Sequence, residues 1–227
     1  MRYKKEEVGQ GIGATRKSTT NVRIANRTGS NVTLGASGAS ATVQDNIFHE
    51  LGEQQRLREA TQRFQMYLEA QREGHYQNAV PLQGELLEMM QGFFAPAILK
   101  KFKLLELKNQ RLENPWFYPI ARKNGLNNLP ELAHMAVAIF LDVSVFNDKI
   151  TARNLFHGLV HAAQIQVLGV DEFCNLFVGG FLQARSYFLV PLKAHAFGLD
   201  ARFAANPEEP FSVEHEIRAW WKAGRYS

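Results

Sequence analysis

The chain has 227 residues, of which 45% are hydrophobic and 21% are charged, a composition typical of a folded globular protein with an ordinary core. Its single cysteine, Cys174, excludes an internal disulfide and favours a reducing, cytoplasmic setting. The N-terminal residues lead into no apolar segment, and no apolar run approaches the roughly 18 to 20 residues that a membrane helix needs, so we expect neither a secretory signal nor a membrane span.

The net charge of +4 is concentrated in residues 1–45, which carry seven basic and three acidic side chains, whereas the rest of the chain is balanced. A basic segment can contact nucleic acid, but no aromatic residue follows Tyr3 here to stack on bases, so a solvated tail is the preferred interpretation. Two β-prone runs, 21–25 and 31–34, flank a turn-forming segment. An isolated hairpin is marginal in water, so the sequence predicts either a flexible tail or a small β-prone module that docks elsewhere.

Residues 46–110 are predicted to form a helical segment. Apolar residues recur at helical spacing from Asn46 to Gly74, a second helical stretch opens at Pro81, and a third follows Pro96 as far as Leu107. The lysines of the third stretch are expected to form its solvated face.

Residues 111–227 are predicted to form a separate domain. Strict alternation of apolar residues predicts one strand over 136–146. Thr151 can cap a helix that ends at Gly169 and is apolar on nearly every side, which predicts that it is buried. Further helices are expected from Asp171, over Pro191 to Ala204, and over Val213 to Lys222 with Ser212 as its cap. The fold class is therefore α+β, mostly helical, with a short sheet.

The candidate site is the sequence His157-Gly158-Leu159-Val160-His161 inside that buried helix. Histidines at i and i+4 share a helix face and can bind one zinc ion. In zinc peptidases the residue after the first histidine is the glutamate that activates the metal-bound water, but this position holds Gly158. A helical glycine costs about 1 kcal/mol relative to alanine, so either another group approaches closely or the position has lost its former side chain.

The stretch from about Glu113 to Trp220 resembles bacterial zincin-like metallopeptidases of the minimal gluzincin type. The matching pieces occur in order: 114–118, 129–132, the strand at 136–146, 155–164, 180–181, 190–193 and 211–214. The resemblance covers about half of the chain and implies a zincin-like C-terminal domain with a degenerate HExxH motif.

Two departures from the family pattern affect the chemistry. Gly158 replaces the general base, and Lys193, 32 residues after His161, stands where such relatives carry a glutamate as third zinc ligand. A lysine adds positive charge where a catalytic zinc site needs an anionic oxygen. Other candidates for a third ligand are His195, Glu214, His215 and Glu216.

Three interpretations of the histidine pair follow. The preferred one is that His157 and His161 are hydrogen-bonded core residues of a catalytically inactive zincin-like protein, which acts in binding or scaffolding and needs no cofactor. Protein partners would then bind through residues 1–110. The alternatives are residual zinc binding with an unrecognised third ligand, and a metal-dependent hydrolase that takes its base from Asp142 or Glu216.

Overall fold

The computed structural model describes residues 38–226, with side chains from residue 52 onward, and residues 44–227 form one compact unit. The fold is α+β and mostly helical, as the sequence predicted. The hairpin predicted within 21–34 lies outside the described residues. The first helix begins at Gly38, so residues 38–45, which the sequence assigned to the tail, are helical.

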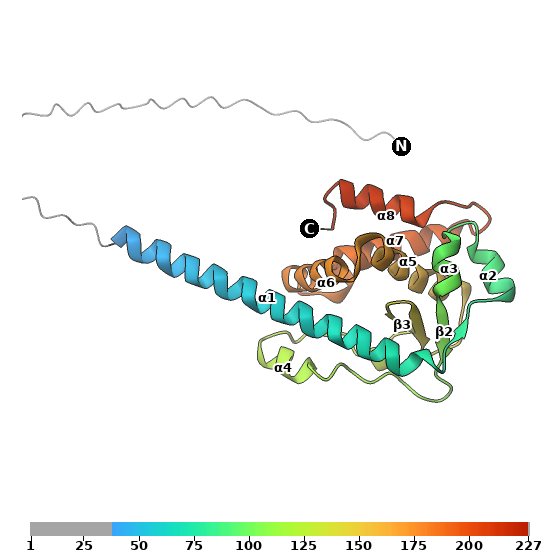
Figure 1. Ribbon diagram of the computed structural model, residues 1–227, viewed down its shortest axis with the longest axis horizontal. Helices are drawn as coiled ribbons and strands as arrows, with labels where there is room; N and C mark the ends of the chain where they lie inside the picture. The colour runs from blue at the N-terminus through green and yellow to red at the C-terminus, as the bar shows by residue number, and fades with distance from the viewer. Residues whose placement is uncertain (1–37, 227) are drawn as a thin grey trace, which may run out of the picture. The chain divides into compact units, whose positions relative to one another are not determined.

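One mixed sheet of four short strands lies in the described part of the chain (Figure 1). The strands are β1 (Val80–Pro81), β2 (Lys103–Glu106), β3 (Val137–Phe140) and β4 (Val143–Phe146). Their order is β1-β2-β4-β3, with β2 and β4 parallel and the other two pairs antiparallel. The strand β3 is therefore an edge, and one of its backbone sides is not paired within the sheet.

The single strand predicted over 136–146 is in fact a hairpin. Phe140 and Val143 pair across a turn at Leu141 and Asp142, and Leu141 has a φ of 58°, in the left-handed region. Such turns usually carry glycine or asparagine, and neither residue occurs at position 141 or 142, so no turn is predicted here. Both carboxylate oxygens of Asp142 accept hydrogen bonds from Arg72, at 2.8 and 3.1 Å, which anchors the turn.

Two predicted helical stretches between 81 and 107 also differ from the structure. Pro81 lies in β1, where it needs no backbone donor, and the helix α2 (Gly84–Met90) begins after it. The helix α3 (Pro96–Lys101) ends early, and the residues expected to continue it form β2. Leucines at 104, 105 and 107 suit a strand beside β4 as well as a helix, and the pairing with β4 decides between the two.

The C-terminal helices agree closely with the sequence. The helices of the described chain other than α2 and α3 are α1 (Gly38–Tyr76), α4 (Tyr118–Lys123), α5 (Ala152–Leu168), α6 (Val170–Ala184), α7 (Pro191–Ala205) and α8 (Val213–Lys222). Thr151, Ser212 and Pro191 begin their helices at the predicted positions. The helix α5 contacts α6, α7, α8 and β3 and is buried, as predicted (Figure 1).

The segments on either side of residue 110 pack as one body. The strand β2 pairs with β4, and Leu112 donates its backbone N–H to the buried side chain of Asn147 at 2.8 Å. On α1, the Phe64 ring stacks on Phe177 of α6 with a centroid distance of 4.9 Å. The boundary that the sequence suggested near 110 therefore does not separate two cores.

In the described part of the chain, no single helix is long and apolar enough to cross a membrane. The helices α5 and α6 would pass such a test together, but they are bent by 116° at their junction.

The N-terminus of α5 offers a first test. Thr151 Oγ1 accepts from the backbone N–H of Asn154 at 3.2 Å, and the Asn154 side chain accepts from Thr151 N–H at 2.7 Å. Thr151→Ala should lower the free energy of unfolding by about 1 kcal/mol, because one helix-terminal donor loses its acceptor. Urea unfolding would measure this; Thr151→Ser, which keeps the hydroxyl, is the control, and an equal loss in both variants would contradict the capping role.

Candidate functional site

The two histidines of the motif are brought together on the buried side of α5. His157 is 8% exposed and His161 is 2% exposed, and their ring centroids lie 4.9 Å apart. The spacing of four residues in a helix produces this arrangement, because it places both side chains on one face.

The Nδ1 atoms of both histidines are held by acceptors. His157 Nδ1 lies 2.7 Å from Oδ2 of Asp200. The other carboxylate oxygen of Asp200, Oδ1, accepts two hydrogen bonds from Arg153. His161 Nδ1 lies 2.7 Å from Gln164 Oε1, whose amide nitrogen donates to the carbonyl of Leu192 at 3.0 Å. Because carboxylate and amide oxygens only accept, both imidazoles carry their proton on Nδ1 and present a lone pair at Nε2.

Lys193 occupies the position between the two Nε2 atoms. Its Nζ lies 3.2 Å from His157 Nε2 and 2.9 Å from His161 Nε2, so it donates a hydrogen bond to each. Lys193 extends from the first turn of α7 and is 4% exposed. The Tyr187 ring, with its centroid 4.8 Å from Nζ, covers another side of the amine. The lysine is thus part of the site, in hydrogen-bonding contact with both histidines.

Burial controls the protonation of this cluster. It lowers the pKa of Lys193 from 10.5 to about 7, with the charge of Asp200 opposing the shift. Burial also lowers the pKa of His157, against the effect of its hydrogen bond to Asp200. It lowers the pKa of His161 well below its usual value, with the charge of Lys193 adding to the effect. The histidines are therefore neutral acceptors at neutral pH.

The strand β4 approaches α5 so closely at Gly158 that there is no space for a side chain at this position. A Cβ atom built at this position would lie 2.6 Å from Ser144 Oγ and 3.6 Å from Ser144 Cβ. Ser144 is fully buried on β4, and its hydroxyl has no hydrogen-bond partner among the described residues. The space that a side chain at position 158 would need is therefore occupied by Ser144.

The other residues considered from the sequence lie apart from the histidine pair. His195 Nδ1 bonds to the Tyr226 hydroxyl at 2.6 Å, and its ring stacks on Trp220. Glu214 accepts from the backbone N–H of Ala95 at 2.7 Å.

The remaining candidates are also engaged elsewhere. Glu216 pairs with Arg202 at 3.1 Å, and Asp142 pairs with Arg72 on the β3–β4 turn. His215 lies in the first turn of α8, where its backbone N–H donates to Ser212 Oγ. Within the described chain, none of these side chains forms a hydrogen bond or ion pair with His157 or His161.

Three residues of the site were missed by sequence reasoning. Gln164 is three residues after His161 in the same apolar helix, where a buried amide requires partners. Asp200 is seven residues after Lys193, so the two share a face of α7. Both were therefore accessible from helical spacing. Ser144 was not, because its contact depends on how the sheet packs against α5.

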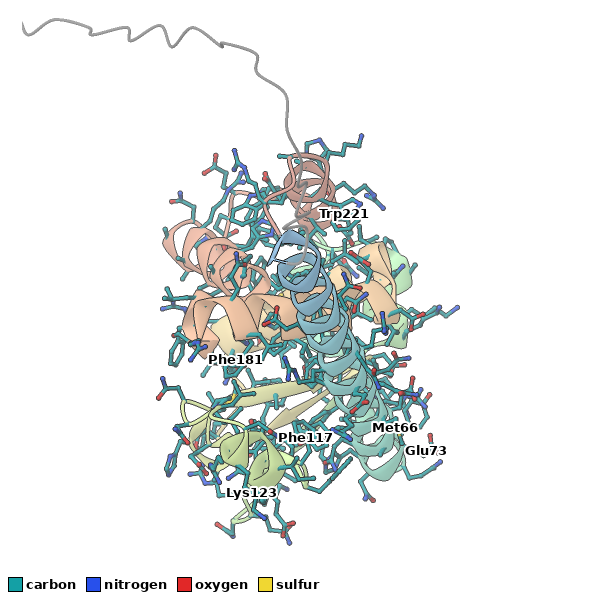
Figure 2. All side chains as sticks on the ribbon, turned by 90° about the vertical axis from the view of Figure 1, so that its left-hand side faces the viewer. Met66, Glu73, Phe117, Lys123, Phe181 and Trp221 are labelled. Atoms are coloured by element: carbon teal, nitrogen blue, oxygen red, sulfur yellow. The ribbon has the colours of Figure 1, made fainter. Side chains whose placement is uncertain are left out.

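A cavity of about 1110 Å³ opens beside the cluster. It is lined by α1, β3, α4 with its preceding loop, α5 and α6, and it includes His157, His161 and Lys193. Figure 2 locates Phe117 beside α4 and Phe181 on α6, both of which line the cavity, with α1 in the foreground. The histidine–lysine cluster therefore borders a space large enough for a small molecule.

Comparisons with protein-family models, with curated proteins and with solved structures found no match for the chain. The resemblance to zincins thus stays a prediction from the sequence.

The cluster does not fit a resident zinc ion. Zinc lies about 2.0–2.1 Å from histidine nitrogens and needs at least three protein ligands. Here an amine stands between the two Nε2 atoms at hydrogen-bond distances of 2.9 and 3.2 Å. Among residues 52–226, whose side chains the structure describes, no group of three or more His, Cys, Asp or Glu side chains is arranged to hold a metal.

The contact between Gly158 and Ser144 predicts an energetic coupling. Gly158→Ala should destabilise the protein by about 1–3 kcal/mol, because the new methyl group overpacks against Ser144. The better helix propensity of alanine should offset about 1 kcal/mol of this cost. In a Ser144→Ala background the hydroxyl is gone, so the same change should become neutral or stabilising. Urea unfolding of the four proteins measures the coupling.

Gly179 is the control for this cycle, because a Cβ there meets no atom within 4 Å. Gly179→Ala should therefore show only the propensity gain. An unchanged effect of Gly158→Ala in both Ser144 backgrounds would refute the explanation.

The buried amine predicts a pH dependence of stability. Since the pKa of Lys193 is about 7 in the folded protein and 10.5 in its ordinary state, the unfolded chain binds the additional proton between these values. The stability of the wild type should therefore rise with pH above about 7, by up to about 1.4 kcal/mol per pH unit, and the full penalty should be present below about 7. Urea unfolding of wild type and Lys193→Met from about pH 6 to 9 isolates this contribution. A difference between the two that is constant with pH would contradict it.

Proposed function

We propose that this chain is a zincin-like protein without peptidase activity that acts in binding or scaffolding. The observation that carries the proposal is the position of Lys193 Nζ, within hydrogen-bond distance of both Nε2 atoms of the His157–His161 pair. In a zincin that position belongs to the metal. A cationic or neutral amine held there by two hydrogen bonds satisfies the same lone pairs that zinc would use.

The surroundings of the motif support the same proposal. Peptide hydrolysis on zinc needs an open coordination position and a base for the attacking water. The base position is Gly158, and Ser144 takes up its space. Asp142 and Glu216, the substitute bases suggested by the sequence, are engaged by Arg72 and Arg202. No observation therefore favours the alternative of a metal-dependent hydrolase.

The partner side of the proposal is less specific. We propose that protein partners contact residues 1–110 and that the basic segment 1–45 does not bind nucleic acid, in a cytoplasmic setting. In the described part of this region, Met66 and Val80 are 55% and 56% exposed. Exposed apolar side chains of this kind suit protein contacts, although single ones are also common on ordinary surfaces.

Metal analysis tests the proposal. Protein purified without a histidine tag and then dialysed against zinc should hold no stoichiometric metal and should not hydrolyse casein above the buffer background. Stoichiometric zinc that is lost in His157→Ala or His161→Ala, or a chelator-sensitive peptidase rate, would overturn the proposal.

A gain of metal binding is the sharper form of this test. A carboxylate oxygen at position 193 would stand about 1.5 Å short of the present Nζ, because glutamate is one bond shorter than lysine. Lys193→Glu should therefore create a two-histidine, one-carboxylate site that binds zinc or Co²⁺, measurable by calorimetry and by the visible spectrum of Co²⁺.

The control for the gain is Lys103→Glu, which changes the charge equally at a lysine that contacts Tyr76 instead. Adding His161→Ala to Lys193→Glu should abolish the new binding. Gly158→Glu is not combined with Lys193→Glu in this test, because a side chain at position 158 would collide with Ser144. If Lys193→Glu folds and binds no metal, then position 193 is not the only element that prevents metal binding.

A further inference from the structure

Among the described residues that line the cavity, Lys193 is the only charged one that is buried. The other charged lining residues of the described chain, on α1 and at the end of α6, are exposed: Glu53, Arg56, Glu59, Arg63 and Arg185. Lys193 is 4% exposed, and no carboxylate of residues 52–226 forms an ion pair with it. A positive charge in the cavity lining is therefore not matched by a carboxylate in direct contact.

The hydrogen bonds leave this amine with unused capacity. An ammonium group has three donors, and two of them go to His157 Nε2 and His161 Nε2. The nearest acidic side chain of the cluster, Asp200, is already engaged by His157 and Arg153. A ligand anion would receive the third donor and would neutralise a desolvated charge, which is the condition in which a charged hydrogen bond is strongest.

An aromatic wall leads from this cluster toward α1. Ring centroids follow one another from His161 to Phe173 at 6.3 Å, from Phe173 to Phe177 at 6.0 Å, and from Phe177 to Phe64 at 4.9 Å. The three phenylalanines line the cavity. A cation at one end of an apolar wall is complementary to a molecule with an anionic head and a hydrocarbon tail.

One buried polar group that lines the cavity has no partner among the described residues. The Tyr67 hydroxyl is buried and has no hydrogen-bond partner among the described residues, and Tyr67 lines the cavity. Buried hydroxyls without a partner are rare in folded proteins, so this one indicates that the cavity holds something polar, either water or part of a ligand.

We propose that the cavity binds an amphiphilic carboxylate, such as a medium-chain fatty acid, with the carboxylate on Lys193 Nζ and the chain along Phe173 and Phe177. This rests on the proposed function, because it requires that position 193 holds an amine and not a metal ion. The cavity volume of about 1110 Å³ exceeds what one such chain needs, so water would fill the remainder.

Calorimetry on the full chain with three probes measures separately how the carboxylate group and the hydrocarbon chain of the ligand contribute to binding. Dodecanoate, dodecan-1-ol and acetate would be titrated below the micelle concentration of dodecanoate. We expect dodecanoate to bind once per chain, dodecanol at least tenfold more weakly, and acetate without detectable heat. Equal affinity for dodecanoate and dodecanol, or no saturable binding of dodecanoate, would overturn the proposal.

Two variants test the two ends of the site. Lys193→Met should weaken dodecanoate at least tenfold and leave dodecanol unchanged, whereas Lys103→Met, a lysine outside the cavity lining, should change neither. Gly179→Phe adds a ring at a cavity-lining position where a Cβ meets no atom within 4 Å, so it should weaken both dodecyl ligands without touching the amine.

If Lys193→Met does not fold, the preference of the wild type for dodecanoate over dodecanol together with the Gly179→Phe result decides the question. Unaltered dodecanoate binding in a folded Lys193→Met variant, or in Gly179→Phe, would also overturn the proposal. These readouts are independent of zinc: a metal-binding wild type would defeat the proposed function, whereas a metal-free protein that ignores dodecanoate would defeat only this inference.

Discussion

The donation of two hydrogen bonds by Lys193 to His157 and His161 is the interaction on which the rest of the site depends. It joins α7 to α5 at the centre of the helical layer, and Asp200, two turns later on α7, makes a second connection through His157. Five polar side chains are buried here, and each polar atom of the two imidazoles has a partner. A buried polar network in which every member is satisfied can specify one packing of two helices, whereas an incomplete one would be costly.

The contact between Gly158 and Ser144 links this network to the sheet. Because a side chain at position 158 would meet Ser144 Oγ at 2.6 Å, the glycine allows β4 to approach α5 closely beside the two histidines. Of the two explanations that the sequence left open for Gly158, close approach is the one that the packing supports. The neighbouring strand occupies the volume that a side chain at position 158 would need, and the cost of a helical glycine is balanced by the packing that it permits.

Local signals in the sequence were sufficient for the C-terminal helices but not for the short strands. Thr151, Pro191 and Ser212 are caps or first-turn residues whose effect is local, and they mark helix starts where the structure has them. The turn at Leu141 contains no typical turn-forming residue and is stabilised by the contact of Arg72 with Asp142. The alternation of apolar residues therefore predicts one continuous strand where the structure has a hairpin. In the same way, β2 is a strand because β4 lies beside it. Pairings between distant segments are not visible in local periodicity.

The candidate site shows a similar division, because the role of one residue depends on contacts that local sequence patterns do not display. Helical spacing correctly brought His157 and His161 together, and burial of their helix was correctly inferred. From the sequence, Lys193 is only an unfavourable charge in the place of a zinc ligand, because its role as a hydrogen-bond donor depends on packing between α5 and α7. The structure indicates a different role, since two neutral imidazoles with Nδ1 protons present the same pair of lone pairs to an ammonium group as to a metal ion. The partners that orient the imidazoles, Asp200 and Gln164, would serve either cation equally well. An amine at position 193 therefore engages the lone pairs of both imidazoles, and it does so beside the cavity that His157, His161 and Lys193 line together.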